Sequence, residues 1–282
     1  MSFQTIEMTE HEFRLIRDLV NGHCGIWVPD HARSSLAAKL SRLLEASHLD
    51  RYYDYYHLIK YGDPHELDRA IDAIVNNESY FFRETPQLEA IVELVRNADP
   101  TAHRAVRILS AGCSTGEEPY TIAMLLDNAG LLDGPTRVEI HGVDISIQAL
   151  DRARSATYTS GSFRGAEGRY LDWYFKPAAG RLQLDERLRR RVSFSRHNLR
   201  DHTHLATLGM FDIVLCRNVI IYFDTANKLR AVEGLVRVLR EGGHLFMGHS
   251  ESLYSITNAL EMVQVKGAIG YRKPLERAVP CP

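Results

Sequence analysis

The chain has 282 residues, of which 45% are hydrophobic, and a formal net charge of −2. This length suits one large domain or two small ones, no apolar run approaches the ~20 residues of a membrane-spanning helix, and the N-terminus does not resemble a secretory signal. Four scattered cysteines without C-x-x-C spacing favour a reduced environment such as the cytoplasm over a disulfide framework.

The first part of the chain, residues 9–75, predicts a bundle of short helices. Thr9 and Glu12 form a capping box ahead of apolar residues at helical spacing. Further on, Asp63 precedes Pro64 and Glu66, which is the pattern of an N-cap followed by a first helical turn. We therefore expect an N-terminal helical domain over residues 1–76.

From about residue 105 the pattern alternates between strands and helices, which predicts a parallel sheet covered by helices. The predicted strands are 106–111, 138–144, 192–197, 211–217, 244–248 and a closing pair, 260–266 and 268–273. The predicted helices are 116–129, 146–156 and 225–240, the last stopped by Gly242 and Gly243. Turn signals in residues 158–191 break the alternation and predict a small inserted β-subdomain.

A small-residue turn, SAGCSTG at residues 110–116, joins the first predicted strand to a helix that opens with two glutamates. Such a turn directs backbone N–H groups and the helix dipole at one ligand. Only Gly112 and Gly116 are present and no lysine follows, so the dinucleotide and P-loop patterns are disfavoured. We expect Glu118 to close a capping box with Thr115. Glu117 is then left either to meet a cationic ligand group or simply to complement the helix dipole.

Asp144 closes the next predicted strand, in the segment HGVDIS. A carboxylate at this place can accept both hydroxyls of a ribose, and the alternative is an N-cap for the following helix. Together with the segment NESYFFRE at residues 77–84, these features indicate S-adenosylmethionine chemistry.

Four segments occur in order along the chain: NESYFFRE (77–84), SAGCSTGEEPY (110–120), FDIVLCRNVIIYFD (211–224) and GHSES (248–252). In combination they resemble the chemotaxis receptor methyltransferase (CheR) family. The resemblance implies a class I S-adenosylmethionine-dependent methyltransferase, an α/β fold with a Rossmann-like sheet. It also implies a linker at 77–90 over the active site and a methyltransferase domain at 91–282 that contains the inserted β-subdomain at 158–191.

The resemblance also implies a set of site residues. Arg83 and Tyr222 match the positions nearest the transferred methyl group. Ser79 stands where the family usually has threonine, and Gly112 where it often has alanine, a difference expected to matter little. The implied cofactor-binding residues are Asn77, Ser79, Arg83, Gly112, Glu117, Asp144, Asn198, Leu199, Arg217 and Asn218.

The implied activity is methylation of glutamate side chains in the cytoplasmic helical region of methyl-accepting chemotaxis receptors, with S-adenosylhomocysteine as product. A glutamate with a pKa near 4.3 is already ionised at pH 7, so no general base is needed. We expect a cytoplasmic monomer without metal, nucleic-acid partner or membrane insertion. Two alternatives stay open: a non-catalytic cofactor- or partner-binding protein on the same fold, and a methyltransferase of a different acceptor.

Overall fold

The computed structural model describes residues 6–102 and 104–275 of the chain. Four helices form the N-terminal bundle, α1 (Glu10–Cys24), α2 (Arg33–Ala46), α3 (Tyr52–Tyr61) and α4 (Pro64–Ile74). The capping box of Thr9 and Glu12 is confirmed, and Asp63 caps α4 as predicted. The bundle has its own hydrophobic core, in which Phe13, Leu40 and Tyr55 are fully buried.

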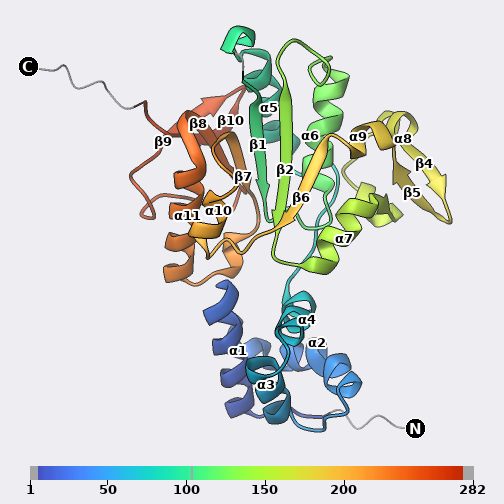
Figure 1. The fold of residues 1–282 in the computed structure, drawn as a ribbon, viewed down its shortest axis with the longest axis vertical. Coiled ribbons are helices and arrows are strands. Elements are labelled where there is room, and N and C mark those ends of the chain that lie inside the picture. The colour runs from blue at the N-terminus through green and yellow to red at the C-terminus, as the bar shows by residue number, and fades with distance from the viewer. Residues whose placement is uncertain (1–5, 103, 276–282) are drawn as a thin grey trace, which may run out of the picture.

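A seven-stranded sheet forms the centre of the larger part of the molecule, in the order β6-β2-β1-β7-β8-β10-β9 (Figure 1). The strands β6, β2, β1, β7 and β8 are parallel, and the pair β9–β10 closes the sheet as an antiparallel hairpin, so the predicted architecture is confirmed. The bounds are β1 (Val106–Ala111), β2 (Val138–Asp144), β6 (Val192–Arg196), β7 (Phe211–Cys216), β8 (Leu239–Met247), β9 (Glu261–Val265) and β10 (Ala268–Arg272).

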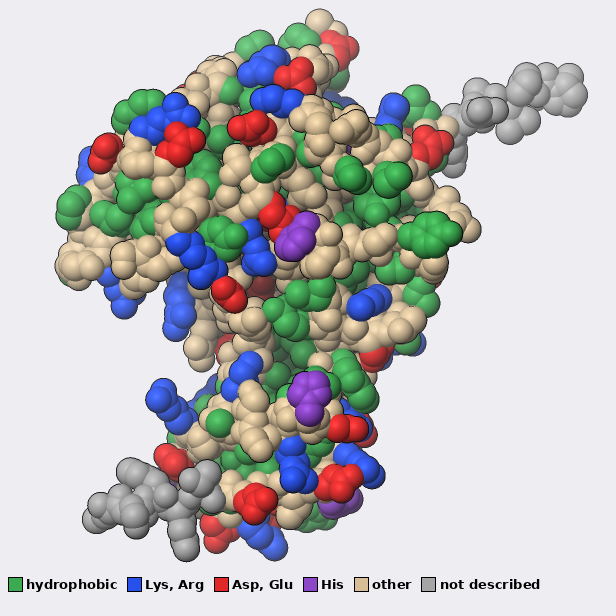
Figure 2. All heavy atoms as spheres, turned by 180° about the vertical axis from the view of Figure 1, so that it is seen from behind, with side chains coloured by type: hydrophobic (Ala, Val, Ile, Leu, Met, Phe, Trp, Pro, Cys, Tyr) green, Lys and Arg blue, Asp and Glu red, His purple; other side chains and the backbone are tan. Residues whose placement is uncertain are grey.

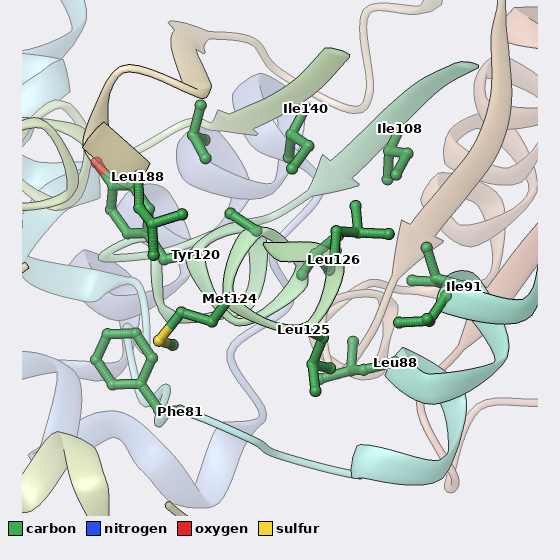
Figure 3. Close-up of a cluster of buried hydrophobic side chains, with 14 of the residues drawn as sticks. Phe81, Leu88, Ile91, Ile108, Tyr120, Met124, Leu125, Leu126, Ile140 and Leu188 are labelled. Atoms are coloured by element: carbon green, nitrogen blue, oxygen red, sulfur yellow. The ribbon is translucent and has the colours of Figure 1, made fainter. Parts of the chain in front are cut away.

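Helices cover both faces of the sheet. On one face, α6 (Glu117–Asn128) packs next to α5 (Thr85–Arg96), which itself contacts β9 and β10. Figure 3 shows the apolar side chains of α6 between Ile108 and Ile140 of the strands and Leu88 and Ile91 of α5. The other face packs against α11 (Thr225–Val238). The remaining helices of the sheet domain are α7 (Ile147–Ser155) and α10 (His202–Ala206).

The insertion after α7 contains a three-stranded antiparallel sheet in the order β3-β5-β4, with the bounds β3 (Thr157–Tyr158), β4 (Phe175–Ala178) and β5 (Arg181–Leu184). Two helices that the sequence pattern did not indicate complete it, α8 (Gly168–Tyr174) and α9 (Glu186–Arg189). The ring of Phe81 packs among Tyr158, Phe163 and Phe175 of the insertion. The insertion therefore holds the segment that precedes α5.

The predicted end of the last helix is corrected. The helix predicted for 225–240 ends at Val238, and Gly242 and Gly243 lie inside β8 instead of stopping a helix. Gly242 has a φ of 74°, a left-handed conformation that glycine adopts easily. Such a glycine occurs at irregular points of strands as well as at helix ends, so it did not mark the end of this helix. The predicted linker of 77–90 includes the start of helix α5, at Thr85. Among the described residues, no helix combines the length and apolar character needed to cross a bilayer.

Candidate active site

The carboxyl ends of β1, β2 and β7 meet at the edge of the sheet that faces the helical bundle (Figure 1). They bring together the turn after β1, Asp144 at the end of β2, and Arg217 and Asn218 after β7. In open α/β sheets, ligands bind in the crevice outside the carboxyl ends of the strands. A cavity of about 320 Å³ lies here, which is within the range of small-molecule sites.

Ten of the eleven site residues expected from the sequence line this cavity, although they come from five separate stretches of the chain. They are Asn77, Ser79, Arg83, Gly112, Asp144, Asn198, Leu199, Arg217, Asn218 and Tyr222. The eleventh, Glu117, lies just behind the wall: it is 2% exposed and is hydrogen-bonded to Ser79, Thr115 and Ser162.

The turn after β1 has no room for side chains at its glycines. Gly112 has a φ of 76°, and a Cβ atom there would lie 2.4 Å from Cγ2 of Val219. The expectation that an alanine at Gly112 would matter little is therefore wrong for this chain, because the alanine would be strained and would displace Val219. Gly116, with a φ of 91°, is the N-cap residue of α6.

Asp144 is held by backbone N–H groups. Ser114 N donates to Oδ2 at 2.8 Å and Ser146 N donates to Oδ1 at 2.9 Å. Burial raises the pKa of Asp144, and these amide contacts oppose the rise. The alternative role of Asp144 as a helix N-cap is not found, because Ser146 caps α7 through its own hydroxyl. The carboxylate is thus fixed in position at the cavity wall.

The predicted capping box of Thr115 and Glu118 is wrong, because the left-handed Gly116 makes Glu117 the first residue of α6. The Thr115 hydroxyl instead donates to Glu117, at 2.7 Å from Oε2. Glu118 lines the cavity, accepts from Ser110 Oγ at 2.7 Å and pairs with Arg217 at 3.1 Å. Burial raises the pKa of both glutamates, and the charge of Arg217 opposes this rise at Glu118.

Arg217 is the centre of a buried charge network that the sequence did not reveal. Its side chain is 2% exposed and lies between Glu118 and Glu84, the latter at 3.3 Å. It also donates to the backbone carbonyl of Arg83 at 2.5 Å. Arg217 thereby ties the end of β7 to α6 and to the segment that covers the cavity. Glu84, next to Arg83, and Glu118, just after the turn, were the available signal in the sequence. Their partner, Arg217, lies far from both along the chain.

Arg83 and Tyr222 face the same cavity from different segments. The Arg83 guanidinium lies over the Tyr80 ring, 5.5 Å from its centroid, and donates to Glu78 O at 3.3 Å. Within the described residues, no carboxylate lies at ion-pair distance from Arg83. Asn76 Nδ2 donates to the Tyr222 hydroxyl at 2.9 Å, so the hydroxyl hydrogen is free to donate to a ligand.

The helical bundle supplies a wall of the cavity that sequence reasoning missed. Ile26, Trp27, Val28 and Leu36 line it, and no polar motif marks these residues. Seen from behind, the bundle meets the sheet domain at a narrow waist where hydrophobic side chains are visible (Figure 2). The cavity is therefore enclosed by two structural units with different surfaces.

The lining of the cavity offers polar atoms that a bound S-adenosylmethionine would meet. Among the described residues, buried Asn218 Oδ1 and His197 Nδ1 lack a hydrogen-bond partner, and both residues line the cavity. Such atoms are costly unless a ligand or water meets them. No group of three or more metal-ligating side chains occurs in the part of the chain that the structure describes.

Fold and site together define a class I S-adenosylmethionine-dependent methyltransferase. Comparison with known families supports this: residues 77–269 match "CheR methyltransferase, SAM binding domain" and residues 11–75 match "CheR methyltransferase, all-alpha domain". The chain belongs to the CheR methyltransferase family.

Its relatives carry two kinds of name. The chain is 34% identical to "Chemotaxis protein methyltransferase 2" of Vibrio cholerae, over 95% of both chains. It is 31% identical to "Chemotaxis protein methyltransferase" of Salmonella typhimurium, over 98% of this chain and 94% of the relative. It is also 36% identical to "Probable biofilm formation methyltransferase WspC" of Pseudomonas aeruginosa, over 79% of this chain and 53% of that relative.

Proposed function

We propose that this protein transfers the methyl group of S-adenosylmethionine to glutamate side-chain carboxylates of chemoreceptors. One observation carries the proposal: Arg83, without a carboxylate partner among the described residues, and Tyr222 line the cavity that Asp144 and Asn218 also line. The names of the chemotaxis relatives support the choice of acceptor. The acceptor would be the cytoplasmic helical region of a receptor, and the enzyme would act there as a monomer.

The sheet wall would hold the cofactor. Asp144, fixed by two backbone N–H groups, would accept the ribose hydroxyls. Asn218 Oδ1 would accept from a cofactor N–H or O–H group, and Asn198 and Leu199 would flank the adenine. Ser79, backed by Glu117, would meet the amino-acid end.

The acceptor carboxylate would need orientation, not deprotonation, because it is ionised at pH 7. S-adenosylmethionine supplies a methyl group on a positively charged sulfur. Arg83 would hold the carboxylate through its planar N–H groups, and Tyr222 would donate its hydroxyl hydrogen. The apolar residues of the bundle would exclude water from a reaction in which opposite charges are neutralised.

The stretch of residues 181–200 is rich in arginine, but several of these arginines already pair with carboxylates of the same chain. They are therefore less available to bind an acidic receptor surface than the composition indicates. Arg187 and Arg191 pair with Asp127 and Asp133, and Arg196 pairs with Asp68 of the bundle. These contacts are partly exposed and could exchange for receptor carboxylates, but they already serve the fold.

The test is methylation of receptor-containing membranes with S-adenosylmethionine labelled in the methyl group. We expect label on a receptor that is released by mild base, as for a methyl ester, and lost when the receptor glutamates are replaced by alanine. Because one relative is named for biofilm formation, the receptor panel should cover both chemotaxis and biofilm signalling. Base-stable label, or label on no receptor, would contradict the proposal and favour another acceptor or a non-catalytic role.

A further inference from the structure

The segment GHSES at residues 248–252 helps to identify the family, yet no role for its glutamate follows from the sequence. Glu251 is only 8% exposed, although it carries a carboxylate. Its Oε2 accepts from Asn218 N at 2.6 Å and from Gly248 N at 2.9 Å. Its Oε1 accepts from Val219 N at 2.9 Å and from Ile221 N at 3.2 Å. One side chain thus satisfies four backbone donors.

Three of these donors, those of Asn218, Val219 and Ile221, lie where the chain leaves the sheet after β7. Asn218 has a φ of 59°, so the strand conformation ends there and the following N–H groups have no place in the sheet ladder. Successive N–H groups in such a bend form a concavity that binds anions. Here the anion is a carboxylate of the same chain, from 30 to 33 residues away.

The bend held by Glu251 carries three residues of the cavity wall, Asn218, Val219 and Tyr222. It also reaches the helical bundle, because Trp27 N donates to Tyr222 O at 2.7 Å. Gly248 allows the close approach: a Cβ atom there would lie 2.7 Å from Glu251 Oε2 and 2.8 Å from Asn218 N. A displaced Glu251 would therefore move both walls of the cavity at one point.

We propose that Glu251 is a positioning residue that fixes residues 218–222, so that the Asn218 amide meets the cofactor and the Tyr222 hydroxyl meets the acceptor. The role given to Tyr222 rests on the proposed function. The role given to Asn218 and the contact with Trp27 do not depend on which acceptor is used.

The test is Glu251→Gln. Glutamine keeps the shape, but it offers one oxygen to four N–H groups and turns its own NH₂ toward two of them. We expect the S-adenosylhomocysteine dissociation constant to rise about tenfold, the equivalent of one lost hydrogen bond. We expect kcat to fall about 10- to 100-fold, with a smaller change in the KM of the acceptor, because the reacting groups are misplaced.

A spectroscopic measurement reports the bend directly. Trp27 and Trp173 are the two tryptophans of the chain, so Trp173→Phe leaves Trp27 as the single emitter. In this background, Glu251→Gln should shift the Trp27 emission, since the Tyr222 carbonyl moves away from the Trp27 backbone.

Glu12→Gln is the matched control. Glu12 is also 8% exposed, and it accepts from the backbone N–H groups of Thr9 and Tyr53 at 2.8 Å and 2.9 Å. It lies at the start of α1, away from the cavity. This variant should lower the melting temperature and leave the dissociation constant, kcat and Trp27 emission unchanged.

The proposal is overturned if Glu251→Gln keeps the parent dissociation constant and emission, or if Glu12→Gln shows the same losses. Should Glu251→Gln fail to fold, Gly248→Ala replaces it, because the added methyl separates Glu251 from Asn218. Parent values in a folded Gly248→Ala also overturn the proposal. If the parent protein methylates no receptor, the proposed function fails, while calorimetry and emission still decide the role of Glu251.

Discussion

The two walls of the cavity differ in chemistry. The sheet wall carries Asp144, Glu118 and Arg217, each held by several polar contacts. Of the described bundle residues that line the cavity between positions 24 and 39, Lys39 alone is charged, and its ammonium donates to Ile74 O at 2.6 Å. The difference indicates a division of labour, in which the sheet binds and orients ligands and the bundle keeps water out. Substitutions on the two walls should then have separable effects.

The largest expected effect comes from Arg217→Ala, on the sheet wall. It leaves the mostly buried carboxylates of Glu84 and Glu118 without Arg217, although Glu84 keeps its hydrogen bond with His249, and we expect the free energy of unfolding to fall by about 3–5 kcal/mol in urea titrations. Arg104→Ala, which breaks an exposed pair with Asp212, should cost no more than about 1 kcal/mol. Equal losses in the two variants would show that the Arg217 network contributes little.

Arg83→Ala should lower kcat about 100-fold, since it removes the group proposed to orient the acceptor. The free energy of unfolding should change by less than about 0.5 kcal/mol, because Arg83 makes no ion pair among the described residues. Arg83→Lys should restore activity only in part, because the planar fork is lost. Near wild-type kcat in Arg83→Ala, measured with labelled cofactor, would remove this arginine from the reaction.

Asp144→Ala should weaken S-adenosylhomocysteine binding by about 1–3 kcal/mol in calorimetry, as the ribose loses a charged acceptor. Asp151→Ala is the control, because Asp151 pairs only with Arg154 on the exposed side of α7 among the described contacts. Unchanged affinity in the Asp144 variant would place the ribose elsewhere.

On the bundle wall, Trp27→Ala should lower kcat about fivefold and leave S-adenosylhomocysteine affinity within about twofold, because it admits water without removing a polar ligand contact. Trp173→Phe, on the insertion, should change neither quantity. A large loss of affinity in Trp27→Ala would mean that the bundle binds the cofactor directly and that the division between the walls is wrong.

The smallest effect concerns pH. Burial, and then the charges of His204 and His141, lower the pKa of His197 to about 4. An unfolded histidine titrates near 6.5, so the unfolded state binds the extra proton between these values and stability falls as the pH drops from about 6.5 towards 4. We expect about 1 kcal/mol of this loss by about pH 5.8, measured by urea unfolding, and a smaller loss in His197→Gln. The exposed His31→Gln should leave the pH dependence as it is.

The parts of the site that sequence could predict are local. Asp144 follows an apolar strand directly, and the glycine turn at 112–116 follows another, so pattern and position coincide. The partner of Arg217 is different: Glu118 lies 99 residues earlier, and only the pairing of β1 with β7 brings them together. The capping box was misjudged because the φ of Gly116, which sets the first residue of α6, is not encoded in the spacing of Thr115 and Glu118.

The bundle wall could not be predicted for another reason. Ile26 and Leu36 are apolar residues like those of any helical core, and nothing local distinguishes a side chain that faces a cavity from one that faces a neighbouring helix. Glu251 is similar, since a glutamate after a strand is ordinarily a solvent-exposed residue. Both depend on how two distant segments pack.

The contacts between bundle and sheet domain bear on the rate at which spent cofactor is exchanged. Asn21 donates to Asp224 at 2.7 Å, Asn198 donates to His23 O at 2.6 Å, and Asp68 pairs with Arg196. These contacts join the two units whose residues line the cavity, so breaking them would open a way out for S-adenosylhomocysteine. We therefore expect departure of the product, not transfer of the methyl group, to set the pace of repeated turnovers.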